Sequence, residues 1–403
     1  MISKTRAGAV IAIGAGLALA VSSCAGGAPS ASDSGGEPLI FGAELSYTAS
    51  GSNSGPAHEA GIRARFEMEN AAGGIDGHPL QLVTADDALD PAKAPAGART
   101  LVEDENVLAM TTSGSNTALA VQSYLAEHQV LGFNGGASTA LIESQDSTYR
   151  LYNPSYGELG GRIAQYAIEQ LGYTKIGIAY TPDAIGEPFR DGALQVIQAA
   201  GLQAAAVVEF SAGATDASSQ AAQLKQSGAQ IVLINHVPSV DGLIINAAET
   251  IDYHPDYGST FVATNSSMLS LYGDVLNDRI YFASPFVLPT ADEAATYREW
   301  LAKVAGDVDY HDSDALNGWT EADAVVAVLK QAVEDAGGAV PTREQVLTAA
   351  SDIHIADDYL LGLSWSATDY TGVDQARILG MQDGAYYEAD PPADNPVSTV
   401  LPG

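Results

Sequence analysis

From residue 38 onward, short apolar runs rich in β-branched residues alternate with longer segments in which apolar side chains recur at helical spacing. This alternation is typical of βαβ units, in which parallel strands are joined by helices. The run Ile231–Ile234 is apolar at every position, so helices are expected to cover both faces of that strand. The pattern predicts an α/β protein with parallel sheets.

The strands predicted in this alternating region are bounded by Gly, Pro, Asp or Asn. They are Leu39–Leu45, Leu80–Ala85, Val107–Thr111, Val130–Phe133, Lys175–Tyr180, Ala204–Phe210, Ile231–Asn235, Phe261–Thr264 and Ile280–Ala283. Near the C-terminus the helical spacing ends, and further strands are expected at Leu360–Trp365, Gln375–Gln382 and Ala385–Glu388. Asp383 and Gly384 are expected to join the last two as a hairpin turn.

The helices expected between the strands have recognisable end signals. The first, Glu59–Asn70, is followed by Gly73 and Gly74, and glycine readily takes the left-handed conformation that ends a helix. The second is expected to begin at Asp90 as cap, with Pro91 in its first turn. The others are Thr117–Glu127, Leu159–Leu171, Pro188–Ala200, Ser218–Gln226, Val240–Thr250, Asp292–Val304, Ala315–Ala336 and Thr342–Ala350.

These units fall into two sets, one before Tyr152 and one after it, which suggests two lobes. Residues 290–350 are almost wholly helical; if they pack on the first lobe while the last strands return to the second, the chain crosses between lobes three times. We therefore expect residues 38–152 and 286–362 in lobe 1. Residues 153–285 and 363–392 are expected in lobe 2, and residues 393–403 form a tail.

The N-terminal segment has the features of a secretory signal. Lys4 and Arg6 precede the apolar run Ala9–Val21, which is shorter than the ~20 residues of a membrane-spanning helix. The run ends just before Cys24 in a pattern that resembles the lipobox of bacterial lipoproteins. We expect cleavage of residues 1–23, acylation of Cys24 and a flexible tether over residues 24–37; an ordinary secreted protein with an unmodified Cys24 is the alternative.

Composition narrows the range of partners. The 403 residues include 50 Asp or Glu and 17 Lys or Arg, a net charge of −33, which argues against nucleic acid or an anionic bilayer surface as the partner. Apolar residues make up 46%, enough for a buried core, and the length suggests two or three domains. A single Cys excludes intramolecular disulfides and zinc sites built on several thiolates.

Motifs of common enzyme classes are absent from the sequence. There is no P-loop and no Gly-x-Ser-x-Gly elbow, and the seven His residues are never three to five positions apart. Asp307, Asp309, Asp312 and Asp314 lack the Gly and Glu of a calcium loop, and we interpret them as a solvated acidic loop. We expect no catalytic residue, no cofactor and no metal.

Several segments together resemble one protein family. Residues 67–77 read Glu-Met-Glu-Asn-Ala-Ala-Gly-Gly-Ile-Asp-Gly and are followed by Asp86-Asp87, Asp90-Pro91, Ser113-Gly114-Ser115 and, in a late helix, Ala322-Asp323-Ala324-Val325. This order resembles the periplasmic branched-chain amino acid binding proteins of ABC importers. The resemblance implies the type I periplasmic binding protein fold: two doubly wound lobes with parallel sheets, a hinge of three strands, and a ligand held between the lobes.

Open α/β sheets bind ligands at the carboxyl ends of their strands, here in small, hydroxyl-bearing loops before helices. The resemblance implies that Ser113, Ser115, Ser138 and Thr139 hold a ligand carboxylate; the alternative is that each is only a helix cap. Tyr156 is an aromatic candidate for the cleft. The full set of predicted ligand-binding residues is Tyr47, Ser113, Ser115, Asn116, Ala137, Ser138, Thr139, Ile185, His236, Ser239 and Asn265.

Two positions depart from the amino acid binders of this family. Ile185 stands where they usually have Tyr, and Ser239 stands where they have an acidic residue, so the usual clamp for the ligand ammonium is missing. A neutral or anionic ligand with some apolar surface fits better, because an unpaired buried ammonium is costly. The alternatives are that Asp183, Asp241 or Glu44 supplies the acid, or that the alignment slips by two residues in these loops.

The resemblance implies a lipid-anchored, extracytoplasmic and monomeric solute-binding protein that is not an enzyme. It would deliver a small carboxylate, amide or amino acid-like compound to an ABC permease in the membrane, touching that membrane only through its anchor. A ligand-sensing ectodomain and a small-molecule amidase or hydrolase are the alternatives.

Overall fold

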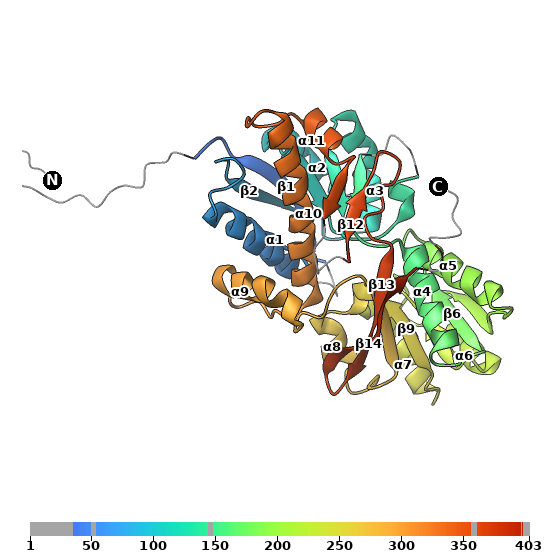
Figure 1. Ribbon diagram of the computed structural model, residues 1–403. Helices are drawn as coiled ribbons and strands as arrows, with labels where there is room; N and C mark the ends of the chain where they lie inside the picture. Colours follow the sequence, from blue (N-terminus) through green and yellow to red (C-terminus); the bar gives the residue numbers. More distant parts are fainter. Residues whose placement is uncertain (1–34, 50–53, 144–147, 356–360, 396, 398–403) are drawn as a thin grey trace, which may run out of the picture. The chain divides into compact units, whose positions relative to one another are not determined.

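Two sheets, each with its own helices, make up most of the structure (Figure 1). The computed structural model describes residues 35–49, 54–143, 148–355, 361–395 and 397. Cys24, the expected signal peptide and the tether up to residue 34 lie outside the described residues. So do Leu360 of one predicted strand and residues 396 and 398–403 of the predicted tail.

The first sheet has five parallel strands in the order β2-β1-β3-β4-β5. Its strands are β1 Leu39–Leu45, β2 Leu80–Asp86, β3 Ala109–Thr112, β4 Leu131–Asn134 and β5 Tyr149–Leu151. Every residue of β3 and β4 is buried, as expected for central strands covered on both faces. The helices between these strands are α1 Ser54–Ala71, α2 Ala94–Arg99, which continues as a π-helical turn over Thr100–Asp104, and α3 Ser115–Glu127.

The second sheet has seven strands in the order β14-β13-β10-β9-β8-β6-β7. The parallel strands are β6 Ile176–Tyr180, β7 Ala206–Glu209, β8 Ile231–Leu233, β9 Asp256–Thr260 and β10 Ile280–Ser284. The hairpin β13 Gln375–Gln382 and β14 Ala385–Asp394 adds antiparallel to β10. Asp383 and Gly384 both have positive φ, at 51° and 75°, as the predicted hairpin turn requires.

Helices accompany the second sheet in the same alternating way. They are α4 Tyr156–Glu169, α5 Gly186–Ala199, α6 Ser218–Ser227, α7 Pro238–Thr250 and α8 Ser266–Tyr272. The later elements are α9 Ala295–Val304, α10 Ser313–Asp335, α11 Arg343–Ala349 and a two-stranded antiparallel sheet of β11 Ile353–Ile355 and β12 Leu363–Trp365. Among the described residues, no helix is both long and apolar enough to cross a bilayer.

The long helix α10 packs directly on α1 (Figure 1). A Cβ atom at Gly318 would lie 2.0 Å from the carbonyl oxygen of His58, so only glycine lets the two backbones approach this closely. In the same region, Nε2 of His58 lies 2.6 Å from Oε2 of Glu321, and both side chains are buried. This contact fixes the N-terminal half of α10, which borders the candidate site described below.

The structure confirms the α/β fold class and corrects several local predictions. Phe261–Thr264 is not a strand: β9 ends at Thr260, whose Oγ1 accepts the Val262 N–H and starts a 3-10 turn. The predicted helix start at Asp90 and Pro91 is also wrong. Oδ1 of Asp90 accepts the Ala92 N–H in a local turn, and α2 begins only at Ala94. The sequence patterns missed β5, β9, α8 and β11.

Candidate functional site

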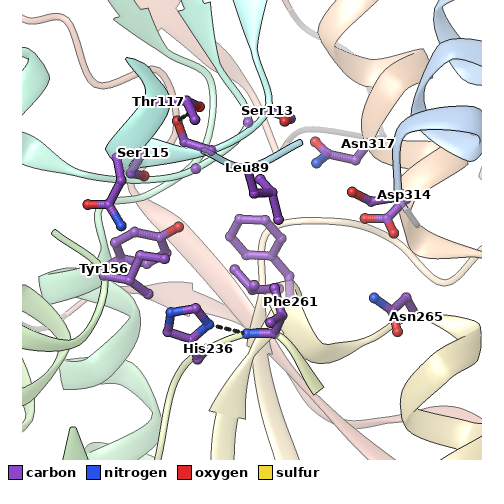
Figure 2. A pocket seen from close by; sticks show the side chains of 18 of the residues that line it. Leu89, Ser113, Ser115, Thr117, Tyr156, His236, Phe261, Asn265, Asp314 and Asn317 are labelled. Atoms are coloured by element: carbon purple, nitrogen blue, oxygen red, sulfur yellow. Dashed lines mark hydrogen bonds between the residues drawn. The ribbon is translucent and has the colours of Figure 1, made fainter. Parts of the chain in front are cut away.

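A cavity of about 160 Å³ lies between elements of the two sheets, at the carboxyl ends of their strands (Figure 2). The first sheet contributes the loops after β2, β3 and β4, and α10 contributes its first turns. The second sheet contributes the loops after β6, β8 and β9, together with the starts of α4 and α8. An apolar cavity of roughly 150 Å³ is known to hold a benzene-sized molecule. The space therefore suits a small solute.

The start of α3 forms one wall of the cavity. Its N-cap residue Gly114 is extended, with φ −108° and ψ 144°, and no side chain caps the first turn. Ser115, Asn116 and Thr117 of that turn all line the cavity. The first-turn amides of a helix have no intrahelical acceptor, and the helix dipole makes this end attractive to an anion. These N–H groups can hold a carboxylate. The nearby Ser113 and Ser115 hydroxyls donate to Asp87 and Asn134, and each has to turn toward a ligand to donate to it instead.

Behind this wall, three polar side chains converge on Gly136. The Ser115 hydroxyl donates to Oδ1 of Asn134 at 3.4 Å. Burial raises the pKa of Tyr156 to about 12, so the Tyr156 hydroxyl stays protonated. A Cβ atom at Gly136 would lie 2.2 Å from Oγ of Ser115, 2.8 Å from Oδ1 of Asn134 and 3.1 Å from the Tyr156 hydroxyl. Glycine at this position is therefore what leaves room for these groups beside the cavity.

The second-sheet side of the cavity contains a paired histidine. Nδ1 of His236 accepts the Val237 N–H at 2.8 Å, so the ring proton is on Nε2, which lies 3.5 Å from Oδ2 of Asp183. Oδ1 of Asp183 accepts the amides of Ile185 and Gly186, both at 3.0 Å. Burial alone would raise the pKa of Asp183, but His236 and these amides outweigh it and lower the pKa to about 2. Both carboxylate oxygens of Asp183 are thus already engaged, Oδ2 with His236 and Oδ1 with the start of α5.

Apolar side chains fill the middle of the site, where Leu89 and Phe261 lie close to one another in Figure 2. Leu89 has a φ of 53° and its neighbour Ala88 a φ of 52°, a left-handed backbone that non-glycine residues rarely adopt. Oδ1 of Asp86 accepts the Ala88 N–H at 3.0 Å, and Oδ1 of Asp87 accepts the Leu89 N–H at 2.8 Å. Asp86, the last residue of β2, and Asp87 after it therefore hold a strained turn that presents Leu89 to the cavity.

A second cluster of polar side chains lies at the start of α10. Asp314 and Asn317 line the cavity there, beside Asn265 at the start of α8. Burial and the charge of Asp312 raise the pKa of Asp314 to about 7, while His58 and a hydrogen bond from Asn265 act in the opposite direction. Oδ1 of Asn265 accepts the amides that begin α8, at 3.1 and 3.3 Å, so its NH₂ group is left for Asp314.

The structure brings six of the predicted ligand-binding residues into the cavity wall and leaves five outside it. Those in the wall are Ser113, Ser115, Asn116, Ile185, His236 and Asn265. Those outside are Tyr47, Ala137, Ser138, Thr139 and Ser239. The Tyr47 hydroxyl donates to Oε2 of Glu59 at 2.6 Å instead. In the loop after β4 only Gly135 and Gly136 reach the cavity, and the chain then turns so that Ser138 and Thr139 line a different groove.

None of the three acids proposed as substitutes for the ammonium clamp lines the cavity. Asp183 is occupied as described, and Asp241 is fully buried, with its pKa raised well above the usual range by burial and with Oδ2 accepting from Ser259 at 3.2 Å. Glu44 is buried in β1, near Gly97 of α2. The acid that does line the cavity is Asp314, which we interpreted from the sequence as part of a solvated loop. Asp312 is the N-cap of α10, and recognising it as a helix start would have placed Asp314 in the first turn of that helix.

Within the described ranges, no group of three or more His, Cys, Asp or Glu side chains could hold a metal ion.

The sequence matches the model of the periplasmic binding protein family over residues 41–385. The chain belongs to this family. The match confirms the family resemblance, and solved structures with the type I periplasmic binding protein architecture confirm the fold class. The family consists of solute-binding proteins rather than enzymes.

Individual relatives are more distant. An amino acid binding protein of Pseudomonas aeruginosa is 25% identical over 219 residues, which are 54% of this chain and 57% of that protein. The chain thus matches little more than half the length of such curated relatives.

Two solved structures share the fold at low sequence identity. A branched-chain amino acid ABC transporter protein of Thermus thermophilus with bound valine superposes with a TM-score of 0.80, at 16% identity, over 92% of this chain and 100% of its own. A fatty acid ABC transporter substrate-binding protein from Thermomonospora curvata has a TM-score of 0.78, at 18% identity, over 91% of this chain and 94% of its own. At these identities the likeness concerns the fold.

Proposed function

We propose that this periplasmic binding protein captures a small carboxylate, amide or amino acid-like solute in the cavity and delivers it to an ABC permease. The observation that carries the proposal is the uncapped start of α3, with Ser113 and Ser115 beside it, in the wall of a cavity between two sheets. The permease role is supported by the fold shared with the transporter proteins named above.

Capture would proceed by closure of two lobes. Residues 38–152 and 286–362 would form one lobe, and residues 153–285 and 363–392 the other. The start of α3 provides the first contacts, and Ile185, His236 and Phe261 of the other lobe add theirs when the lobes come together. A ligand that makes more contacts in the closed form shifts the open–closed equilibrium toward it. The closed form, with one surface from each lobe, is the form that a permease would recognise.

The residues around the cavity are arranged for binding rather than hydrolysis. A serine nucleophile needs a base that takes its proton, but the Ser115 hydroxyl donates to the amide oxygen of Asn134. His236 is held by Asp183 and the Val237 amide. Binding without turnover is therefore the function that these contacts support.

The N-terminal sequence pattern favours a location outside the cytoplasm. We propose that the protein is a monomer there and is anchored to the membrane through acylated Cys24. Replacing Cys24 by Ala should release the protein from the membrane fraction, and mass spectrometry of the wild-type N-terminus should find the acyl chains. A Cys24→Ala protein that stays in the membrane fraction would contradict the anchor.

Calorimetry and thermal-shift measurements with purified protein test the binding function, because a ligand that binds the folded state raises the melting temperature. A panel of small carboxylates, amides and amino acids should contain a one-to-one binder that is recovered unchanged. Ser115→Ala should weaken its binding by about 1–3 kcal/mol, while Ser219→Ala, at an exposed position of α6, should not. Equal affinities for both variants would exclude the Ser115 hydroxyl as a ligand donor, and product formation would rule out simple binding.

A further inference from the structure

The polar groups of the cavity gather at two separate places (Figure 2). Ser115 and Thr117, at the start of α3, lie on one side, and Asp314, Asn317 and Asn265 lie on the other. Leu89 and Phe261 occupy the stretch between them. A solute that extends from one group to the other has to be polar at both ends and apolar in the middle.

The two ends differ in electrostatic character. Helix amides and hydroxyls at the start of α3 donate hydrogen bonds and favour an anion. At the other end, Asp314 carries an acceptor carboxylate, and among the described residues of the wall there is no second Asp or Glu and no Lys or Arg. An anion is thus favoured at one end and a hydrogen-bond donor at the other.

Asp314 itself lacks a strong cationic partner in the contacts around it. The charged or titratable groups that act on it or sense its charge are Asp312, His58, Tyr152 and Tyr386, and Asn265 donates a hydrogen bond to it. His58 is already paired with Glu321 at 2.6 Å. Burial and Asp312 keep the pKa of Asp314 near 7, so both protonation states are populated at neutral pH.

Two carboxylates lie near the anion end, and both are already engaged outside the cavity wall. Oδ2 of Asp87 accepts the Ser113 hydroxyl at 3.5 Å, and its Oδ1 accepts the Leu89 N–H at 2.8 Å. Asp183 is engaged by His236 and by the two amides at the start of α5. A donor placed directly beside the ligand carboxylate would therefore find no free carboxylate there. A donor at the far end of the ligand would meet Asp314.

Building on the proposed function, we infer that the solute is a carboxylate with a hydrogen-bond donor, an ammonium or a hydroxyl, at the end remote from the carboxylate, and that Asp314 accepts this donor. Asp314 is then the residue that selects ω-substituted acids over unsubstituted acids and over α-amino acids.

Calorimetry on the purified protein tests this with matched series of straight-chain acids of about three to seven carbons. Each length is measured as the unsubstituted acid, the ω-hydroxy acid, the ω-amino acid and the α-amino acid. The ω-substituted acid of the best length should bind at least about tenfold more tightly than its unsubstituted and α-amino counterparts. A larger gain with ammonium than with hydroxyl would identify the charged donor, and the reverse the neutral one.

Variants and pH then assign the effect to Asp314. Asp314→Asn should remove the preference for the ω-amino acid over the unsubstituted acid of the same length. Asp307→Asn, an exposed position in the loop before α10, is the matched control and should leave this preference unchanged. In the wild type, affinity for the ω-amino acid should rise about tenfold from pH 6 to 8 as Asp314 ionises, while the unsubstituted acid should show no such rise.

The outcomes separate this inference from the function on which it rests. Unsubstituted or α-amino acids that bind as tightly as ω-substituted ones would overturn the inference and leave the carboxylate site intact. So would an Asp314→Asn effect that is equal for all of them. If no acid of the series binds, the carboxylate site fails and the inference with it. Should the variant not fold, the pH series on the wild type still decides.

Discussion

The hydroxyl of Tyr152 donates a hydrogen bond to Oδ1 of Asn317 at 3.0 Å, and so ties the end of β5 to the part of α10 that lines the cavity. The same hydroxyl lies 3.1 Å from Oε2 of Glu321. With its oxygen held by Tyr152, the Asn317 amide directs its nitrogen toward Gly135, at the edge of the cavity. A side chain outside the cavity wall thus orients one inside it.

Tyr152→Phe removes this bond without changing the ring packing. Burial and Glu321 raise the pKa of Tyr152 well above its usual value, so the hydroxyl is a permanent donor. Its loss leaves Oδ1 of Asn317 without this donor, while Oε2 of Glu321 keeps His58 as its partner. We expect a loss of unfolding free energy of about 1–3 kcal/mol and a several-fold weaker ligand. Urea denaturation and calorimetry measure the two effects. Tyr310→Phe, at an exposed position, is the control; a Tyr152→Phe protein with unchanged affinity would refute the orienting role.

Gly136→Ala tests the crowding behind the carboxylate site. The new methyl group would lie 2.2 Å from Oγ of Ser115, so the hydroxyl has to rotate away from its position. We expect carboxylate affinity to fall about tenfold, with a smaller change in unfolding free energy, because a serine rotamer change costs little. Gly213→Ala is the matched control, since its nearest atom outside the adjacent residues is Oγ of Ser211 at 3.8 Å. Equal ligand affinities for the two variants would exclude the Ser115 hydroxyl as a ligand donor.

Leu89→Gly separates backbone strain from ligand contact. A left-handed backbone costs a non-glycine residue roughly 1–2 kcal/mol, and glycine gives back part of that gain through its greater unfolded-state entropy. We therefore expect Leu89→Gly and Ala88→Gly to have unchanged or slightly higher melting temperatures. Only Leu89 lines the cavity, so only Leu89→Gly should weaken ligand binding, by about 1 kcal/mol. If Ala88→Gly weakens binding equally, the turn itself rather than the Leu89 side chain is what matters.

The parts of the fold that the sequence predicted well carry strong local signals. β1 and β13 match their predicted bounds, because each is long and mostly buried and the second ends in a specific hairpin turn. β5 and β11 have only three residues each, which is too short for a period to emerge. Phe261 is buried like a strand residue, yet it belongs to the turn after β9, because burial alone does not distinguish the two.

The candidate site shows the same division between local and tertiary information. Ser113, Ser115 and His236 lie in the cavity wall, as expected for residues that follow strands in this fold. Ser138 and Thr139 satisfy the same rule but face another groove, because the direction of a side chain depends on how the loop turns. Asp314 belongs to an acidic run that looks solvated in sequence. Its place at the cavity results from the packing of α10 on α1, which no local pattern reveals.

Glu44 provides a prediction about stability rather than binding. It is fully buried in β1, and burial together with the charge of Asp87 raises its pKa from 4.5 to about 8. Between these two values the folded protein binds a proton at Glu44 that the unfolded chain does not, so the unfolding free energy falls as pH rises from about 5 to 8. The contribution of the Glu44 proton to the unfolding free energy is complete below pH 4.5 and is lost as the pH rises through 8.

Glu44→Gln imitates the protonated side chain at every pH and removes this dependence. We expect little change in unfolding free energy at pH 5 and a gain of about 2–4 kcal/mol at pH 8, because each pKa unit corresponds to about 1.4 kcal/mol. Denaturant unfolding at both pH values measures the difference. Glu105→Gln, at an exposed position, should show no such divergence. A Glu44→Gln protein whose stability follows the wild type across this range would mean that Glu44 is ionised in the folded state, and that the cost of its burial is met elsewhere.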